Sequence, residues 1–134
     1  MARQEEQVPR CLILDSGAVI GCARGKPRAR AMLRRALELG VDVRIPVPVL
    51  AETLRGGPRD APVHRVRNAV DVFETTEAAA RIAGALLGRA GGHNTVDALV
   101  AAAAIESGGD VLTGDGHDLR KLLANIPRVA VIDV

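Results

Sequence analysis

Aromatic residues and cysteine are scarce in this 134-residue sequence. Phe73 is the only phenylalanine, and tyrosine and tryptophan are absent, which excludes an aromatic platform for stacking nucleic-acid bases. The two cysteines, Cys11 and Cys22, are too few for a disulfide framework and lack C-x-x-C spacing, so we expect small core residues in a reducing compartment. The longest apolar run, residues 98–105, is far shorter than the roughly 18 residues of a membrane span. We therefore expect a cytoplasmic protein without membrane contact.

The composition is typical of one globular domain. Hydrophobic residues make up 48% of the chain and charged residues 25%, close to the average for folded domains. The chain is long enough for a core without disulfide or metal staples, and too short for two ordinary domains. Because residues 1–9 are mostly polar, we expect them to form a disordered lead and residues 10–134 to form a single domain.

Strand and helix patterns alternate along the chain. Short apolar or alternating runs predict strands at 11–14, 41–45, 70–73, 110–113 and 129–134. Amphipathic or capped stretches predict helices at 16–23, 27–39, 48–55, 76–90, 95–107 and 115–125, with a weak helix at 59–69. In the helix that Pro48 opens, Leu50, Ala51 and Leu54 are expected to face inward. The alternation predicts a three-layer α/β domain, with a mostly parallel sheet of about five strands and helices on both faces.

Four carboxylates fall at one edge of this predicted sheet. Asp15 closes the first strand, Glu52 lies in the helix after the second, and Asp115 follows the fourth. Asp97 joins them from the first turn of its helix. Ligand sites of parallel α/β sheets form outside the carboxyl ends of the strands, so we expect the four side chains to converge. Ligands that are all oxygen favour Mg²⁺ or Mn²⁺, and such a site indicates phosphoryl chemistry.

Each of these acids also has a purely structural explanation. Asp97 and Asp118 each follow a potential capping residue by three positions, as acids at helix N-termini do regardless of function. Glu52 could be a solvated helix residue paired with Arg55. Asp15 is the hardest to explain in this way, because a carboxylate directly after a buried strand needs a partner. The coincidence of all four acids at one edge favours a functional site.

Four ordered segments carry a resemblance to a known family. They are Leu-Ile-Leu-Asp-Ser at 12–16, Val-Leu-Ala-Glu at 49–52, Thr-Val-Asp-Ala-Leu-Val-Ala-Ala at 95–102 and Leu-Thr-Gly-Asp-Gly-His-Asp-Leu at 112–119. Together they resemble the motifs of PIN-domain ribonucleases, and the size resembles that of VapC-type toxins of bacterial toxin–antitoxin pairs. Each motif alone is weak, but four in this order are fairly specific and cover nearly all of residues 11–134. The polar lead of nine residues is longer than the usual start of the family.

The resemblance implies a metal-dependent endoribonuclease with a PIN-like domain over residues 10–134. One or two Mg²⁺ or Mn²⁺ ions and an activated water would cleave the RNA phosphodiester, leaving 5′-phosphate and 3′-hydroxyl ends. The implied metal ligands and catalytic residues are Asp15, Glu52, Asp97 and Asp115. The implied auxiliary residues, which orient carboxylates or waters, are Ser16, Thr113 and Asp118. The resemblance also implies a homodimer and a cognate antitoxin whose tail occupies the acidic groove.

Positive charge is concentrated in one segment. The net charge of +2 does not by itself indicate nucleic-acid binding, but residues 24–35 contain six basic side chains and no acid. We predict that this segment binds RNA phosphates beside the metal site, although a solvated helix face explains it equally well. The predicted RNA-binding residues are Arg24, Lys26, Arg28 and Arg30.

Two other classes of function remain open. An aspartate-dependent phosphatase or phosphoacceptor domain would use Asp15 as its nucleophile, but position 17 is glycine where such proteins place a second acid. The only lysines available to it are Lys26 and Lys121. A non-catalytic PIN-like binding module is the other alternative. No Gly-x-x-x-x-Gly-Lys loop, Gly-x-Ser-x-Gly elbow or dinucleotide fingerprint occurs, which removes the commonest rival α/β chemistries.

Overall fold

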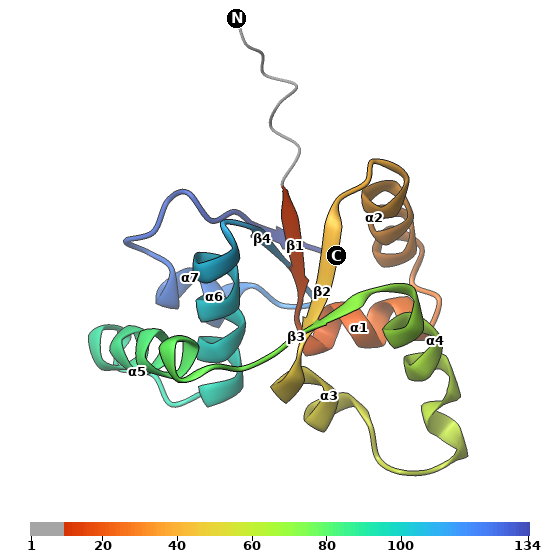
Figure 1. Cartoon of the computed structure of the whole chain (residues 1–134), viewed down its shortest axis with the longest axis horizontal. Coiled ribbons are helices and arrows are strands. Elements are labelled where there is room, and N and C mark those ends of the chain that lie inside the picture. Colours follow the sequence, from red (N-terminus) through yellow and green to blue (C-terminus); the bar gives the residue numbers. More distant parts are fainter. Residues whose placement is uncertain (1–9) are drawn as a thin grey trace, which may run out of the picture.

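The computed structural model describes residues 10–134, so the predicted lead over 1–9 lies outside the described residues. This part of the chain forms one sheet of five parallel strands, in the order β3-β2-β1-β4-β5 (Figure 1). The strands are β1 (Cys11–Leu14), β2 (Asp42–Pro46), β3 (Asp71–Phe73), β4 (Asp110–Thr113) and β5 (Val131–Asp133). The predicted parallel α/β sheet is confirmed.

Helices cover both faces of the sheet, which makes the three predicted layers. They are α1 (Ser16–Ala23), α2 (Pro27–Glu38), α3 (Val47–Thr53), α4 (Ala61–Ala69), α5 (Glu77–Ala90), α6 (Thr95–Ser107) and α7 (His117–Leu122), with a short 3-10 turn, η2 (Pro58–Asp60). Figure 1 shows α1, α2 and α4 together on one side and α5, α6 and α7 together on the other, in agreement with the helix contacts. Among the helices of residues 10–134, none has the length and apolar character needed to cross a membrane.

β1 is the central strand and positions the site. All four of its residues are buried, and it pairs with β2 on one side and β4 on the other. The order of the strands therefore reverses at β1, and parallel α/β sheets bind ligands outside the carboxyl ends of the strands at such a switch point. Asp15 follows β1 and Thr113 ends β4, so these two residues flank the switch point.

Small side chains let α6 approach the sheet closely. The buried alanines of α6 are Ala98, Ala101, Ala102, Ala103 and Ala104, and α6 contacts β1, β2 and β4. Alanine fills little space, so the helix axis can lie near the strands without a void between them. Asp97, in the first turn of α6, is thereby brought to the carboxyl ends of β1 and β4.

The predicted inward face of α3 is wrong at Ala51. Ala51 is exposed, whereas Leu50 and Leu54 are half-buried and pack against the core, and Val49 and Thr53 are buried. The reason is that β2 runs through Pro46 and the helix begins at the next residue without a loop, which fixes the face that turns inward.

The predicted helix over 115–125 is too long. In the structure α7 begins at His117 and ends at Leu122. Asp115 stays outside the helix because its side chain accepts a hydrogen bond from the main-chain N–H of His117, which forms a turn. The other predicted boundaries agree with the observed ones within two residues.

Candidate active site

Asp15 is the most firmly held carboxylate of the candidate site. Its side chain is the N-cap of α1, where Oδ1 accepts hydrogen bonds from the main-chain N–H groups of Ala18 at 2.8 Å and Gly114 at 3.3 Å. Oδ2 accepts a hydrogen bond from the hydroxyl of Thr113. Asp15 is only 6% exposed, and this burial raises its pKa despite the hydrogen bonds, which favour the charged form. The partner that a buried Asp15 requires is therefore supplied by β4 and the first turn of α1.

Two glycines allow β4 and α1 to come this close. A Cβ atom added to Gly17 would lie 2.8 Å from the Cα atom of Gly114, a distance that real Cβ contacts do not show. The main-chain N–H of Gly114 can therefore reach Asp15 only because neither position carries a side chain. Glycine at position 17, where a phosphoacceptor domain would place an acid, thus has a packing role.

Asp97 is half-buried, and its carboxylate makes no contact that would occupy its oxygens within the part of the chain that the structure describes. Asn94 caps α6, since its Oδ1 accepts a hydrogen bond from the main-chain N–H of Asp97 at 2.9 Å. Within residues 10–134, the Asp97 carboxylate has no hydrogen-bond partner. The pKa of Asp97 is raised to about 6, first by burial and then by the negative charges of Asp15, Asp118, Glu52 and Asp115. The four other acids therefore lie near enough to Asp97 to act on its charge.

A pocket of about 610 Å³ joins the acids, and we call it the acidic pocket. Its acidic lining consists of Asp15, Asp97, Asp115 and Asp118, and its basic lining of Arg24 and Lys26. The structure thus brings together three of the four predicted catalytic residues, with the auxiliary residues Ser16 and Asp118 beside them.

Glu52, the fourth predicted catalytic residue, lines a neighbouring pocket and is absent from the lining of the acidic pocket. Ser16, which lines the pocket, donates a hydrogen bond from its hydroxyl to Oε1 of Glu52. The alternative pairing of Glu52 with Arg55 is wrong, because Arg55 donates to the main-chain carbonyls of Ala51 and Leu54 instead.

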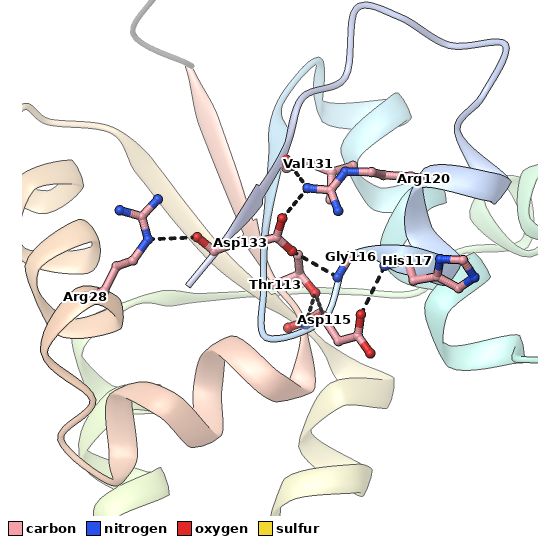
Figure 2. Close-up of polar contacts among 9 residues, drawn as sticks. Arg28, Thr113, Asp115, Gly116, His117, Arg120, Val131 and Asp133 are labelled. Atoms are coloured by element: carbon pink, nitrogen blue, oxygen red, sulfur yellow. Dashed lines mark hydrogen bonds and ion pairs between the residues drawn. The ribbon is translucent and has the colours of Figure 1, made fainter.

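The loop between β4 and α7 holds Asp115 by main-chain hydrogen bonds. The Asp115 N–H donates to the Thr113 hydroxyl oxygen at 3.0 Å, and Oδ1 of Asp115 accepts from the N–H of His117 at 3.2 Å (Figure 2). The Thr113 hydroxyl therefore hydrogen-bonds with both Asp15 and Asp115. Asp115 does not cap α7, because the N-cap is Gly116 and has no side-chain hydrogen bond, whereas Asp118 lies in the first turn of α7 as expected of an acid near a helix N-terminus.

β5 contributes one residue that the sequence analysis does not single out. The Asp133 carboxylate accepts a hydrogen bond from the Gly116 N–H and forms an ion pair with Arg120 (Figure 2). Asp133 is the last residue of β5. Ligand sites of parallel sheets lie outside the carboxyl ends of the strands, so its position at a strand end is a signal that could have identified it. It holds the loop that carries Asp115.

Three of the four predicted RNA-binding side chains are engaged elsewhere. Lys26 donates to the main-chain carbonyl of Val134 at 2.6 Å, and Arg28 donates to that of Asp133 at 3.0 Å. Arg30 donates to the carbonyl of Cys22 at 2.9 Å. Among the described residues, Arg24 has no hydrogen-bond or ion-pair partner, and it lines the acidic pocket. RNA binding by these residues stays a prediction, and Arg24 is the one whose guanidinium has no partner within residues 10–134.

The chemistry of the pocket fits a hard divalent cation. No three His, Cys, Asp or Glu side chains of residues 10–134 form a ready-made metal-binding group, so the acids surround the pocket without closing on one point. Their donors are nevertheless all oxygen, as Mg²⁺ and Mn²⁺ prefer. A cation in the pocket would also offset the repulsion that raises the pKa of Asp97.

Comparison with models of known protein families finds a match for this chain. The family model for the PIN domain matches residues 12–123, from β1 to the residue after α7. The chain belongs to the PIN domain family. The matched segment contains every acid of the acidic pocket, whereas Asp133 lies beyond it. A search of curated proteins finds no match to this PIN domain.

Several solved structures of similar fold come from VapBC proteins, a family of toxin–antitoxin systems. VapBC2 from Rickettsia felis, bound to a DNA fragment from its promoter, aligns with a TM-score of 0.74 at 14% identity and covers 92% of this chain and 98% of that chain. DNA-bound VapBC from Salmonella typhimurium aligns with a TM-score of 0.70 at 21% identity over 91% and 96% of the two chains. VapBC-5 from Mycobacterium tuberculosis aligns with a TM-score of 0.62 at 22% identity over 94% and 100%. At these identities the likeness establishes a shared fold.

Proposed function

We propose that this PIN domain is a divalent-metal-dependent endoribonuclease and the VapC-type toxin of a type II toxin–antitoxin pair. The observation that carries the proposal is the convergence of acids from the end of β1, from α6 and from the β4–α7 loop on one pocket at the switch point of the sheet. Membership in the PIN family and the fold shared with VapBC proteins support it.

The predicted catalytic residues would hold Mg²⁺ or Mn²⁺ in the acidic pocket, and these are Asp15, Glu52, Asp97 and Asp115. When bound, such an ion stabilises negative charge on a phosphodiester and makes water acidic enough to act as a nucleophile at neutral pH. The chain's own residues set the geometry. Thr113 and two main-chain N–H groups orient Asp15, while Ser16 orients Glu52.

Asp97 and Asp118 complete the proposed site in different ways. The carboxylate of Asp97 has no hydrogen bond among the described residues, so both of its oxygens remain available to a cation. Asp118 lines the pocket from the first turn of α7 and adds negative charge beside Asp97. We assign Asp118 an auxiliary role, in which its negative charge helps to raise the pKa of Asp97.

The proposal is tested by RNA cleavage and metal binding with matched variants. We expect the purified protein to cut RNA with Mg²⁺ or Mn²⁺ and to lose this activity on chelation. Asp97→Asn should lower the rate by at least about 100-fold, because even residues outside the ligand set cost about 10- to 100-fold. Glu77→Gln, the same chemical change on the exposed surface of α5, should have no effect. Equal cleavage by Asp97→Asn and the wild type would refute the proposal.

Calorimetry separates the proposed enzyme from a binding module. A catalytic domain should bind Mg²⁺ or Mn²⁺, and Asp97→Asn should weaken that binding. A protein that binds neither ion and leaves RNA intact would be the non-catalytic PIN-like module.

The aspartate-dependent phosphoacceptor alternative has less support. Both carboxylate oxygens of Asp15 already accept hydrogen bonds, and Lys26 is bound to the carbonyl of Val134. Formation of a beryllofluoride adduct on Asp15 would favour this alternative over the nuclease.

We also propose two protein partners, a second copy of the chain and a cognate antitoxin whose tail occupies the acidic pocket. Light scattering of the purified protein tests the homodimer. For the antitoxin, the product of a small neighbouring reading frame should co-purify with this protein and inhibit RNA cleavage. A protein that stays monomeric and has no such neighbour would remove both partners without affecting the nuclease assignment.

A further inference from the structure

A second pocket, of about 480 Å³, adjoins the acidic pocket. Its lining includes Arg24, Arg55 and Arg59, and we call it the arginine pocket. Ile20 and Arg24 line both pockets, so the two share part of their surface. A ligand that lies in the acidic pocket can therefore extend into the arginine pocket without crossing another part of the molecule.

One face of α1 connects the two pockets. Ser16, Ile20 and Arg24 follow one another at intervals of four residues, which places them on the same side of the helix. Ser16 lines the acidic pocket, and Arg24 is the C-cap at the other end of α1. The helix thus forms a common floor that leads from the acids to the arginines.

The two acids of the arginine pocket are already engaged. Asp60 is only 6% exposed, and its carboxylate accepts hydrogen bonds from the main-chain N–H groups of Arg55 and Gly56. Glu52 accepts the hydroxyl hydrogen bond of Ser16. Neither acid forms an ion pair with an arginine of this pocket among the described residues.

The arginines, in contrast, keep free donors. Arg24 and Arg59 have no hydrogen-bond or ion-pair partner within residues 10–134. Arg55 uses Nη1 for the carbonyls of Ala51 and Leu54, which leaves its other guanidinium N–H groups available. A guanidinium group carries a permanent positive charge and a planar fork of donors that matches phosphate oxygens.

We propose that the arginine pocket binds phosphate groups of the RNA strand next to the cleaved bond. The inference rests on the proposed nuclease function, because the acids determine where the cleaved phosphate lies. The phosphates beside it must then contact a neighbouring surface, and the arginine pocket is continuous with the acidic one. Base stacking cannot replace these contacts, since the only Phe, Tyr or Trp residue is Phe73, and the Arg44 guanidinium lies 5.7 Å above its ring.

RNA binding without metal tests the proposal. A fluorescent single-stranded RNA is titrated in EDTA over a range of salt concentrations with the wild type and with Arg24→Gln, Arg55→Gln and Arg59→Gln. We expect each variant to bind about three- to fivefold more weakly and to reduce the slope of log affinity against log salt by about 0.7, the value for one phosphate contact on a single strand. Arg59→Lys, which keeps the charge but not the fork, should keep the slope.

Arg89→Gln is the matched control. Arg89 is exposed on the last turn of α5 and lines neither pocket, so its variant should bind RNA as the wild type does. Thermal unfolding of Arg24→Gln, Arg59→Gln and Arg89→Gln should be unchanged, which excludes a folding defect, in particular for the C-cap residue Arg24. Arg55→Gln should lose a little stability with its two carbonyl hydrogen bonds. With Mg²⁺, the pocket variants should raise KM for RNA and leave kcat nearly unchanged.

The possible results separate the two proposals. Pocket variants that match Arg89→Gln in affinity and salt slope would overturn the arginine pocket, whether or not RNA is cleaved. RNA binding that depends on the arginines, in a protein that never cleaves RNA, would refute the nuclease and retain the phosphate site. Variants that weaken binding of an acidic partner protein but not of RNA would make this surface a protein interface and overturn the proposal.

Discussion

The Asp133 carboxylate accepts a hydrogen bond from the main-chain N–H of Gly116 at 3.0 Å, across a separation of 17 residues. The same carboxylate pairs with Arg120, which also donates to the carbonyl of Val131 (Figure 2). The hydrogen bond and charge of Arg120 hold the pKa of Asp133 below its ordinary value. Gly116 directly follows Asp115, so the position of a candidate metal ligand depends on a carboxylate outside the acidic pocket.

Asp133→Asn should loosen the loop that carries Asp115. The amide keeps an oxygen for the Gly116 N–H but loses the charge that pairs with Arg120. We expect faster hydrogen exchange at Gly116 and His117 and about 10-fold slower RNA cleavage, the lower end of the range for residues that orient metal ligands. Glu77→Gln, which removes the exposed ion pair with Arg81, is the control. Wild-type exchange at Gly116 would show that Asp133 does not hold the loop.

Thr113→Val should reduce activity without removing an acid. Thr113 is fully buried, and its hydroxyl donates to Asp15 and accepts from the Asp115 N–H. Valine has nearly the same shape but leaves both groups without this partner, so we expect RNA cleavage to fall by about 10- to 100-fold. The protein should lose about 1–3 kcal/mol of unfolding free energy in urea.

Thr113→Ser completes this test, because serine retains the hydroxyl. We expect cleavage within a few-fold of the wild type, with a small loss of stability from the missing methyl group. Equal activity of the valine and serine variants would mean that orientation of Asp15 by the hydroxyl is unimportant.

Strand ends carry most of the information that the sequence holds about this site. Asp15 follows four apolar residues, and such a run predicts a buried strand whose end fixes the carboxylate in place. The alanines of α6 predict a closely packed helix face, and this packing brings Asp97 near the strand ends. These features depend on local composition, which a single sequence displays.

Contacts between distant residues are the part that local composition does not display. The hydrogen bond of Asp15 with Thr113 spans 98 residues, and that of Ser16 with Glu52 spans 36. The basic segment is another example, since a run of positive charge does not reveal that the end of β5 lies beside α2. The composition of this segment predicts that Lys26 binds phosphate. In the structure, Lys26 instead donates to the main-chain carbonyl of Val134.

The pKa of Asp97 should be about 6 in the metal-free protein, as measured by carboxyl-detected NMR titration. Asp118→Asn should lower this pKa towards the ordinary value near 3.8, because it removes one of the charges that raise it. Glu106→Gln, on the last turn of α6, should leave the pKa unchanged. Added Mg²⁺ should lower the pKa further, since a bound cation favours the carboxylate. An ordinary pKa in the metal-free wild type would contradict the crowding of acids.

The same shift predicts how stability depends on pH. A pKa raised in the folded state means that folding favours the protonated form, so the contribution of Asp97 to stability falls as the pH rises from about 4 through 6. Asp97→Asn removes this dependence. The unfolding free energy of the variant should therefore increase relative to the metal-free wild type over that interval, and a constant difference would contradict the prediction.

Gly17→Ala should destabilise the protein at the contact between α1 and the β4–α7 loop. The added Cβ would lie 2.8 Å from the Cα atom of Gly114, so main chain must move, and overpacking of this kind costs about 1–3 kcal/mol. Gly84→Ala is the matched control, because Gly84 lies inside α5 with open space around its Cβ position. That change should stabilise the protein by about 0.5–1 kcal/mol through helix propensity. Since the Gly114 N–H binds Asp15, Gly17→Ala should also slow RNA cleavage, and Gly84→Ala should not. Opposite changes in urea midpoint for the two variants are the expected result, whereas equal midpoints would show that α1 and the loop can separate without cost.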